Sequence, residues 1–225
     1  MKHKLSLFYE KLYRHFGPQH WWPAQTPFEV IVGAILTQNT NWRNVERSIE
    51  NLKIRGLLSA KKLYRLPLKE LALEIRPSGY FNIKAARLKA FLEFFFREYA
   101  GSTKKMSGAG TRKLRRQLLS VKGIGPETAD SILLYALNKP IFVVDAYTKR
   151  VLCRHGIAAA TAGYDQLQGI FIKNLPRRIK LFNEYHALIV RLGKEFCLKN
   201  NPRCDTCPLN TKKGNREVKG CESYF

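Results

Sequence analysis

The chain has 225 residues, of which 45% are hydrophobic and 12% aromatic, enough apolar material for a sizeable core in one globular unit or two closely packed halves. Forty lysines and arginines against seventeen acidic residues give a net charge of +23. Self-repulsion of this size opposes compactness, so a polyanionic partner is expected: nucleic acid first, and an anionic membrane surface second. No stretch is long and apolar enough to span a bilayer.

The chain begins with an expected amphipathic helix. Residues 1–16 interrupt their apolar positions with charges every few residues, unlike the continuous apolar segment of a signal peptide. The protein is therefore expected inside the cell, in a cytoplasm of the prokaryotic type and associated with the nucleoid. In that reducing compartment the five cysteines should be thiols rather than disulfides, so their clustering matters more than their number.

The next predicted helix begins at Pro27. Thr26 is the expected N-cap, Pro27 suits the first helical position, and Glu29 would close a capping box. Apolar residues recur at helical spacing and also fill the flanking positions, so this helix should be central and buried. These residues are Phe28, Val30, Ile31, Val32, Ala34, Ile35 and Leu36.

Helical periodicity continues through most of the chain, which predicts an all-α fold. Further helices are predicted at 42–53, 67–75, 83–99, 111–119, 126–138, 146–155, 164–173 and 177–194. Glycine, serine and proline mark connecting loops at 55–58, 76–80 and 100–110. The one extended apolar run, 141–144, has no second strand to pair with.

A glycine-containing turn joins the predicted helices 111–119 and 126–138. Hydrophobic residues and glycines alternate over 121–125 except for one lysine, and glycines without side chains let backbone N–H groups approach a phosphate at the start of a helix. A lone Gly-x-Gly is also common in ordinary helix turns, but the flanking helices and the basic charge favour phosphate binding. Such contacts fix position along DNA and carry no sequence information. The candidate DNA contacts are Lys122, Gly123, Ile124 and Gly125.

Several motifs resemble those of the endonuclease III superfamily of DNA glycosylases. They are LTQNT (36–40), VKGIGPETAD (121–130), VVDAYTKRV (143–151) and CLKNNPRCDTCPL (197–209), in that order. Two more, HWWP (20–23) and RPSGYFNIKAARL (76–88), are most similar to the endonuclease-III-type 3-methyladenine DNA glycosylases.

The resemblance implies a two-domain, all-α, helix-hairpin-helix glycosylase fold with a C-terminal iron–sulfur cluster loop. Residues 26–138 would form a six-helix barrel that contains the hairpin. Residues 1–25 and 139–225 would form a second, discontinuous domain, with a damaged base flipped into the cleft between the two. The expected partner is double-stranded DNA containing damaged bases, and the expected state is a monomer.

The resemblance also gives Asp145 the catalytic role. On the sequence alone, an aspartate at a helix start is usually an N-cap. In the superfamily this carboxylate stabilises the positive charge that develops on the sugar, or orients water, as the glycosidic bond breaks.

Glu127 stands where bifunctional members of the superfamily carry a nucleophilic lysine. A carboxylate cannot form the imine that the lysine forms with the sugar, so a monofunctional glycosylase that uses water is expected. Two alternatives stay open. One is a bifunctional glycosylase and lyase for oxidised or mismatched bases, with a displaced lysine. The other is a non-catalytic protein on the same scaffold that binds DNA structures.

Three tryptophans, Trp21, Trp22 and Trp42, flank the predicted buried helix. Matching aromatic residues line the base pocket in the alkyladenine branch. A methylated purine in DNA is cationic and a tryptophan face attracts a desolvated cation, so an alkylated purine such as 3-methyladenine is the expected substrate. The alternative is that two of the three are core or surface residues. Gln38 matches the residue that fills the gap left by the flipped base; its alternative is a solvated loop glutamine.

Four cysteines near the C-terminus, Cys197, Cys204, Cys207 and Cys221, are separated by six, two and thirteen residues. In the superfamily the ligands of a [4Fe–4S] cluster are separated by six, two and five residues, so the fourth cysteine comes late here. The longer loop can still reach back, because the ligands need only converge in space. A structural zinc site with four cysteines is the competing interpretation. Cys153, alone on a predicted helix, is expected in the core.

Overall fold

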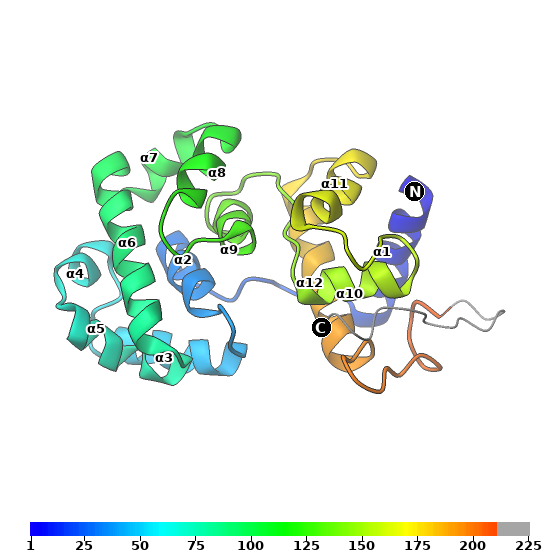
Figure 1. The fold of residues 1–225 in the computed structure, drawn as a ribbon, viewed down its shortest axis with the longest axis horizontal. Coiled ribbons are helices and arrows are strands. Elements are labelled where there is room, and N and C mark those ends of the chain that lie inside the picture. The colour runs from blue at the N-terminus through cyan, green and yellow to red at the C-terminus, as the bar shows by residue number, and fades with distance from the viewer. Residues whose placement is uncertain (211–225) are drawn as a thin grey trace. The chain divides into compact units, whose positions relative to one another are not determined.

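A computed structural model describes residues 1–210, and every regular element in that range is a helix (Figure 1). The predicted all-α class is therefore confirmed. The described chain divides into two compact units: Trp22–Lys139, and Met1–Trp21 together with the described residues from Pro140 onward. Among the described helices, none has both the length and the apolar character needed to cross a membrane.

The unit Trp22–Lys139 is built around α2. Its helices are α2 (Pro27–Leu36), α3 (Trp42–Ile54), α4 (Ala60–Arg65), α5 (Leu68–Glu74), α6 (Phe81–Tyr99), α7 (Thr103–Gly108), α8 (Thr111–Leu119) and α9 (Pro126–Ser131). Every residue of α2 from Glu29 to Leu36 is buried, and the helix packs against α3, α6 and α9. The prediction of a central, buried helix at this place is confirmed.

The start of α2 differs in one detail from the predicted capping box. Thr26 does cap the helix, since its hydroxyl accepts from the Glu29 N–H at 3.1 Å. The Glu29 carboxylate does not return to the Thr26 backbone; it accepts from the Gln25 N–H at 3.1 Å and forms an ion pair with Lys53 at 2.7 Å. Glu29 therefore ties α2 to α3 as well as to the preceding chain.

Three short helical segments were not predicted. The loop predicted at 100–110 contains α7, which Ser102 caps and whose Met106 is fully buried. The loop predicted at 76–80 contains a 3-10 turn, Arg76–Ser78, and α4 lies in a segment with no predicted element. Each segment is too short for a helical period to emerge from its sequence. In α4 and α7 a serine cap and one buried side chain stabilise the helix.

The second helix of the hairpin is not one continuous α-helix, as 126–138 had predicted. After α9 the chain continues as a π-helix, Ile132–Ala136, in which the Leu137 N–H donates to the Ile132 carbonyl at 3.2 Å. All five residues of this wider turn are buried. A π-turn rotates the following side chains relative to an α-helix, and it is often found beside functional sites.

The other unit has α12 (Ile179–Glu195) at its centre. Around it lie α1 (Lys2–Phe16), α10 (Ala146–Arg154) and α11 (Tyr164–Asn174). Residues 141–144 are buried and extended but pair with no strand in the described chain. From this segment the Phe142 ring stacks on Phe171 at 3.7 Å and meets Phe182 edge-on at 5.4 Å, forming an aromatic core.

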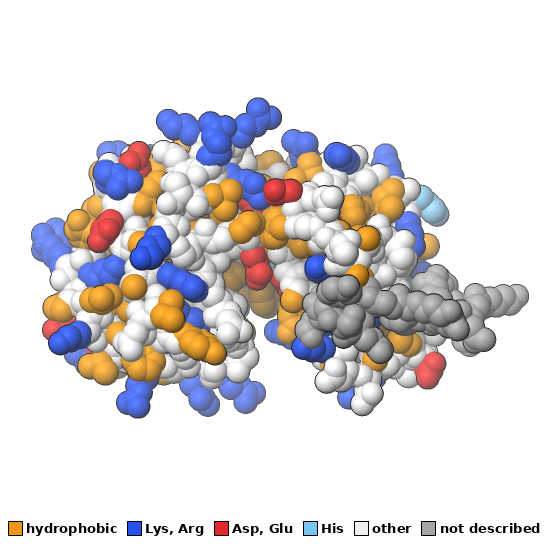
Figure 2. Space-filling model, viewed as in Figure 1, with side chains coloured by type: hydrophobic (Ala, Val, Ile, Leu, Met, Phe, Trp, Pro, Cys, Tyr) orange, Lys and Arg blue, Asp and Glu red, His pale blue; other side chains and the backbone are white. Residues whose placement is uncertain are grey.

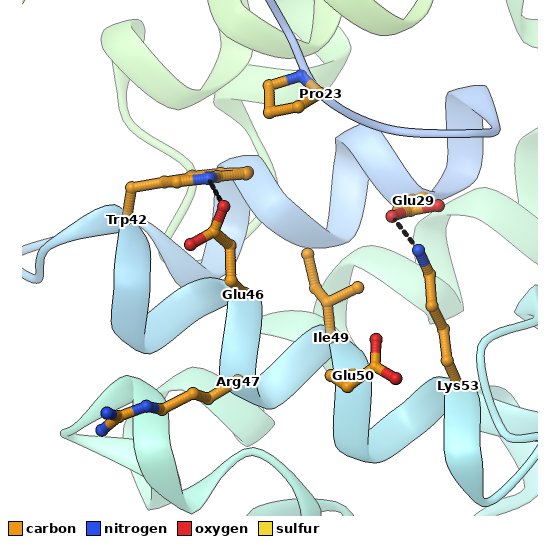
Figure 3. A pocket seen from close by; sticks show the side chains of 8 residues that line it. All are labelled: Pro23, Glu29, Trp42, Glu46, Arg47, Ile49, Glu50 and Lys53. Carbon is orange, nitrogen blue, oxygen red and sulfur yellow. Dashed lines mark hydrogen bonds and ion pairs between the residues drawn. The ribbon is translucent and has the colours of Figure 1, made fainter.

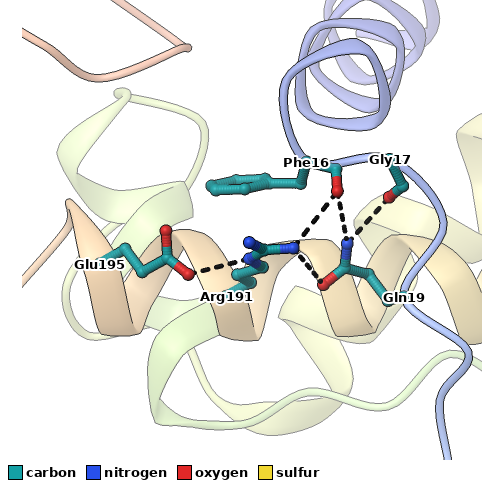
Figure 4. Close-up of polar contacts among 5 residues, drawn as sticks. All are labelled: Phe16, Gly17, Gln19, Arg191 and Glu195. Atoms are coloured by element: carbon teal, nitrogen blue, oxygen red, sulfur yellow. Dashed lines mark hydrogen bonds and ion pairs between the residues drawn. The ribbon is translucent and has the colours of Figure 1, made fainter.

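Arg191 of α12 holds the segment that follows α1 (Figure 4). Its guanidinium lies over the Phe16 ring at 4.8 Å and donates to the Phe16 carbonyl at 3.2 Å. The Gln19 amide donates to the carbonyls of Phe16 and Gly17, and Glu195 pairs with Arg191 at 2.8 Å. These bonds fix the chain immediately before the two adjacent tryptophans.

Candidate functional site

The turn between α8 and α9 is formed by residues 120–125 and depends on one glycine in particular. Gly123 has a φ of +86°, and a Cβ there would lie 2.3 Å from Cγ of Arg87. Val121 and Ile124 are buried beneath the turn, and the Ile124 N–H donates to the Val121 carbonyl at 3.0 Å. The buried side of the turn is therefore apolar, and its exposed side is formed by Lys122, Gly123 and Gly125.

Of the four DNA contacts predicted in the hairpin turn, Lys122, Gly123 and Gly125 are exposed, whereas the Ile124 side chain belongs to the core. Within residues 1–210, no hydrogen bond takes the N–H of Gly123 or Gly125. These two donors can approach an anion, but the Ile124 N–H is already used inside the turn. Ile124 thus packs beneath the turn and does not form part of its exposed side.

A buried ion pair joins the two helices of the hairpin. The Arg115 guanidinium of α8 donates two hydrogen bonds to the Asp130 carboxylate of α9, at 2.8 and 3.1 Å. Asp130 is fully buried. A two-point contact of this kind restricts the angle between α8 and α9 more than a single bond would.

Gln38 lies against the hairpin. Its Nε2 donates to the Gly123 carbonyl at 3.0 Å and to the Thr128 hydroxyl at 2.9 Å, and Arg87 donates to its Oε1. The structure thus brings Gln38 and Gly123 together although they are 85 positions apart. Insertion of Gln38 into DNA, as predicted from the resemblance, requires release of these three bonds.

Basic side chains gather on the helices that precede the hairpin turn (Figure 2). Five lysines and arginines of α7 and α8 are exposed: Lys104, Lys105, Arg112, Lys113 and Arg116. This grouping was not predicted, although four basic residues fall within the nine residues of α8. Such a patch contributes a favourable and salt-dependent term to phosphate binding.

An exposed aromatic residue, Tyr80, stands at the start of α6 and was not predicted as a site residue. Tyr80 is 64% exposed and has a φ of +46°. The buried Lys84 fixes the preceding turn, because its ammonium donates to the Ser78 carbonyl at 2.6 Å. Burial, and then the charge of Arg87, lower the pKa of Lys84 to about 8. A held, exposed tyrosine can stack on a nucleobase.

Trp22 and Trp42 form a right-angled corner. Their ring centroids lie 5.0 Å apart and the ring planes meet at 89°. Trp22 packs over Gly33, where a Cβ would lie 3.2 Å from the indole, and Tyr135 of the π-helix approaches it at 5.2 Å. Two of the three predicted pocket tryptophans are thus in contact; Trp21 falls in the other compact unit.

Trp42 also lines a pocket of about 430 Å³ along α3 (Figure 3). Its indole N–H donates to Glu46 one turn later at 2.6 Å. The other lining residues are Pro23, Glu29, Arg47, Ile49, Glu50 and Lys53. The lining carries three carboxylates and two basic side chains, and Glu29 is paired with Lys53, so this pocket is less basic than the chain as a whole.

Asp145 caps α10 and uses its two oxygens differently. Oδ1 accepts from the Thr148 N–H at 2.7 Å and from the Thr148 hydroxyl at 2.8 Å. Oδ2 lies 3.6 Å from Nε2 of His186, which belongs to α12. The two side chains are only 12% and 7% exposed. The N-cap interpretation and a second role are therefore compatible, because the cap occupies one oxygen only.

The surroundings of Asp145 keep it ionised. Burial favours a raised pKa, but the close approach and charge of His186, followed by the Thr148 hydrogen bonds, outweigh burial and lower the pKa of Asp145 below its ordinary value. His186 was not predicted as a site residue. Its only signal was a histidine on the apolar face of the predicted helix 177–194.

Three of the four predicted cluster ligands lie in the described chain. Cys197 is buried, Cys207 is half-buried and Cys204 is exposed, and all three are free thiols. Burial raises the pKa of Cys207, and the charges of Cys197 and Cys204 raise it further. Cys221 lies outside the described residues. Cys153 is buried, as predicted.

Arg154 of α10 organises the loop around the first of these cysteines. Its guanidinium lies 3.4 Å from the Cys197 sulfur and donates to the carbonyls of Leu198 and Lys199 at 2.5 and 2.8 Å. A positive group beside a sulfur favours the thiolate, the form that binds metals. Within residues 1–210, no three His, Cys, Asp or Glu side chains are close enough together to hold a single metal ion.

Comparison with known proteins identifies the family. The pattern that defines the HhH-GPD superfamily of base excision DNA repair proteins matches residues 32–177. A protein of Methanocaldococcus jannaschii, named as a DNA repair glycosylase, is 50% identical over 203 residues, which cover 89% of this chain and 91% of that protein. Endonuclease III of Bacillus subtilis is 24% identical over 81% of this chain and 78% of its own.

Solved structures agree with these sequence matches. The H. pylori 3-methyladenine DNA glycosylase, determined with 1,N6-ethenoadenine bound, is 30% identical, with a TM-score of 0.74 over 85% of this chain and 97% of that chain. A trapped covalent intermediate of endonuclease III with DNA has a TM-score of 0.79 over 93% of both chains; at 20% identity it shows the fold alone. The helix-hairpin-helix fold is thereby confirmed, and the chain belongs to the HhH-GPD superfamily of base excision DNA repair proteins and is a DNA glycosylase.

Proposed function

We propose that this DNA glycosylase removes alkylated purines, with 3-methyladenine as the first choice, and that it hydrolyses the glycosidic bond without cutting the DNA backbone. The observation that carries the proposal is the Trp22–Trp42 corner, whose Trp42 side also lines a pocket with three carboxylates. A flat cation gains from an indole face and from nearby negative charge, whereas a neutral base gains less from both. The H. pylori relative, named a 3-methyladenine DNA glycosylase, supports this assignment.

The proposed reaction assigns one task to each part of the chain. The exposed N–H groups of Gly123 and Gly125, with the basic side chains of α7 and α8, hold the phosphates of double-stranded DNA. The flipped base stacks on tryptophan. Asp145, ionised at neutral pH, stabilises the positive charge on the sugar or orients the attacking water. A methylated purine already carries positive charge, so its departure needs no further general acid.

Incubation with methylated DNA tests the substrate. The purified protein should release 3-methyladenine, detected by chromatography of the free bases. Trp42→Ala should reduce this release much more than it reduces affinity for undamaged DNA, because phosphate contacts dominate general binding. Tyr13→Ala is a matched control, since Tyr13 is a 42% exposed aromatic in the other unit. Efficient removal of thymine glycol or a mismatched base, with no purine released, would show the substrate assignment to be wrong.

The monofunctional reaction has its own test. Glu127 lies in the first turn of α9, at the position of the nucleophilic lysine, and cannot form a covalent imine. Borohydride should therefore trap no protein–DNA complex, and product strands should break only after heat or alkali. Some relatives are named endonuclease III, and the same experiment therefore tests the bifunctional alternative. Glu127→Lys provides the comparison, and trapping of the unmodified protein would refute this part of the proposal.

We further propose that Cys197, Cys204, Cys207 and Cys221 bind a [4Fe–4S] cluster. In support, the three described cysteines are free thiols, and the Arg154 guanidinium lies 3.4 Å from the Cys197 sulfur. When bound, the cluster would cross-link the C-terminal segment by four thiolate bonds.

Protein purified without oxygen should accordingly be brown and contain about four irons per chain. Cys221→Ser should lower the iron content and destabilise the C-terminal region if the late cysteine is a ligand, whereas Cys153→Ser should leave the iron content unchanged. One zinc per chain with negligible iron would instead support the zinc alternative.

A further inference from the structure

The face of α12 that meets α10 is built for a very close approach. A Cβ on Gly193 would lie 2.3 Å from Cδ1 of Tyr147, so only glycine lets this ring lie directly on the α12 backbone. The Arg150 guanidinium lies over the Tyr147 ring at 5.0 Å from its centroid and donates to the Gly193 carbonyl at 3.1 Å. These contacts fix the distance between α10 and α12.

His186 lies seven residues before Gly193, two helical turns away on the same face of α12. Its imidazole is buried and meets the Phe142 ring nearly at right angles, at 6.4 Å between ring centroids. Phe142 is in turn stacked on Phe171. The ring therefore has little freedom to turn, and the closeness of the two helices sets its distance from the start of α10.

At that start, the Asp145 carboxylate divides its contacts. Thr148 donates two hydrogen bonds to Oδ1, and Nε2 of His186 lies 3.6 Å from Oδ2. We infer that His186 is a positioning residue for the reaction: it fixes Oδ2 of Asp145, the oxygen that the helix cap leaves for chemistry. This inference rests on the catalytic role proposed for Asp145.

The physical need for such a partner follows from burial. A carboxylate with little access to water tends to take up a proton, which would remove the negative charge that stabilises a cationic sugar. The two hydrogen bonds from Thr148 oppose protonation of Asp145 at Oδ1 only. His186 acts on the other oxygen and contributes more than Thr148 to keeping the pKa of Asp145 low. Without His186 the carboxylate would be both less firmly oriented and easier to protonate.

Other ionisable groups on the surrounding helices have different partners. Arg150 of α10 donates to the carbonyls of Gly193 and Cys197, and Tyr185 of α12 donates to Leu5 of α1. The Tyr164 hydroxyl of α11 accepts from the Val144 N–H. In the described chain the partners given for these three groups lie elsewhere, whereas Nε2 of His186 lies 3.6 Å from Oδ2 of Asp145.

Two substitutions separate positioning from packing. His186→Phe keeps an aromatic ring against Phe142 but removes the nitrogen, whereas His186→Gln restores a neutral hydrogen-bond donor. We expect the single-turnover rate of base release to fall roughly ten- to hundredfold in His186→Phe, as displaced catalytic groups commonly cause. Glutamine should recover most of that rate. Affinity for a duplex with a tetrahydrofuran abasic site should change by less than about twofold in both variants, since phosphate contacts supply it.

His155→Phe is the matched control. His155 packs edge-on against Phe8 at 4.9 Å and lies at the opposite end of α10 from Asp145. This variant should keep the wild-type rate. A His186→Phe variant that is folded and as fast as wild type would overturn the inference, as would a glutamine variant no faster than the phenylalanine one.

A readout that does not depend on activity is the titration of Asp145 itself. In protein labelled with ¹³C at aspartate carboxyl carbons, the Asp145 signal is the one that disappears in Asp145→Asn. Its midpoint should rise in His186→Phe, because burial persists while its main opposing interaction is lost. If the wild-type protein releases no alkylated base, the proposed function is wrong, and the titration of Asp145 alone then tests the positioning role of His186. A raised midpoint then supports the positioning role, and an unchanged midpoint overturns it.

Discussion

Asp145→Asn is expected to abolish base excision while leaving DNA binding intact. Asparagine retains an oxygen that can accept from Thr148, so the cap on α10 should survive. It lacks the negative charge that would stabilise the cationic sugar. The single-turnover rate should fall by a factor on the order of a hundred or more. The measurement is release of 3-methyladenine from methylated DNA, beside affinity for a duplex containing an abasic analogue.

Asp165→Asn provides the control for this substitution, because Asp165 is an acidic residue in the first turn of the neighbouring helix α11. It should leave both the rate and the affinity unchanged. Thermal unfolding of Asp145→Asn should remain a single transition near the wild-type temperature. If the folded variant excises bases at the wild-type rate, the charge comes from another residue and the catalytic assignment of Asp145 is wrong.

Helices with a long apolar stripe could be predicted from the sequence. In α2 the caps and the periodicity agree, so both its place and its burial were predicted correctly. The short α4 and α7 offered no such stripe; each depends on a serine cap and one buried side chain. The π-helix Ile132–Ala136 keeps an apolar pattern that also fits an α-helix, so only the three-dimensional structure reveals the wider turn.

The individual site residues were accessible to sequence reasoning, but their partners were not. Asp145 follows an apolar run at a helix start, and the resemblance selects it. His186 comes 41 positions later, and its approach to Asp145 depends on how closely α10 and α12 pack at Gly193. Similarly, Gln38 meets Gly123 across 85 positions, a contact that no local pattern encodes.

The two glycines of the hairpin turn also differ in a way that the motif conceals. Gly123 has a positive φ, and a side chain there would overlap Arg87. Gly125 has a φ of −88°, which any residue adopts, and no atom lies within 4 Å of the place a Cβ would take. The first glycine is thus required by the fold. The second is free of that requirement, so an effect of its substitution on DNA binding would point to close approach of a phosphate.

Gly123→Ala should destabilise the protein by about 2–4 kcal/mol and weaken DNA binding with it. Left-handed backbone costs an L-residue roughly 1–2 kcal/mol, and the overlap with Arg87 adds a similar amount. Gly125→Ala should change the free energy of unfolding by less than about 0.5 kcal/mol. It should nevertheless reduce affinity for DNA several-fold, since its methyl group would stand where the phosphate approaches the N–H groups of the turn. Urea unfolding and DNA titration of both variants measure the two effects.

Double substitution helps to separate the causes within this turn. Arg87→Ala removes the side chain that Gly123→Ala would strike, so the pair should lose less stability than the two single losses added together. The strain from the positive φ should remain in the double variant, because it belongs to the backbone. If the losses are additive, the Arg87 side chain moves aside without lowering the free energy of unfolding, and backbone strain alone requires glycine at position 123. If Gly125→Ala binds DNA as tightly as the unmodified protein, the phosphate does not approach this glycine, and the basic side chains of α7 and α8 would have to hold the DNA without it.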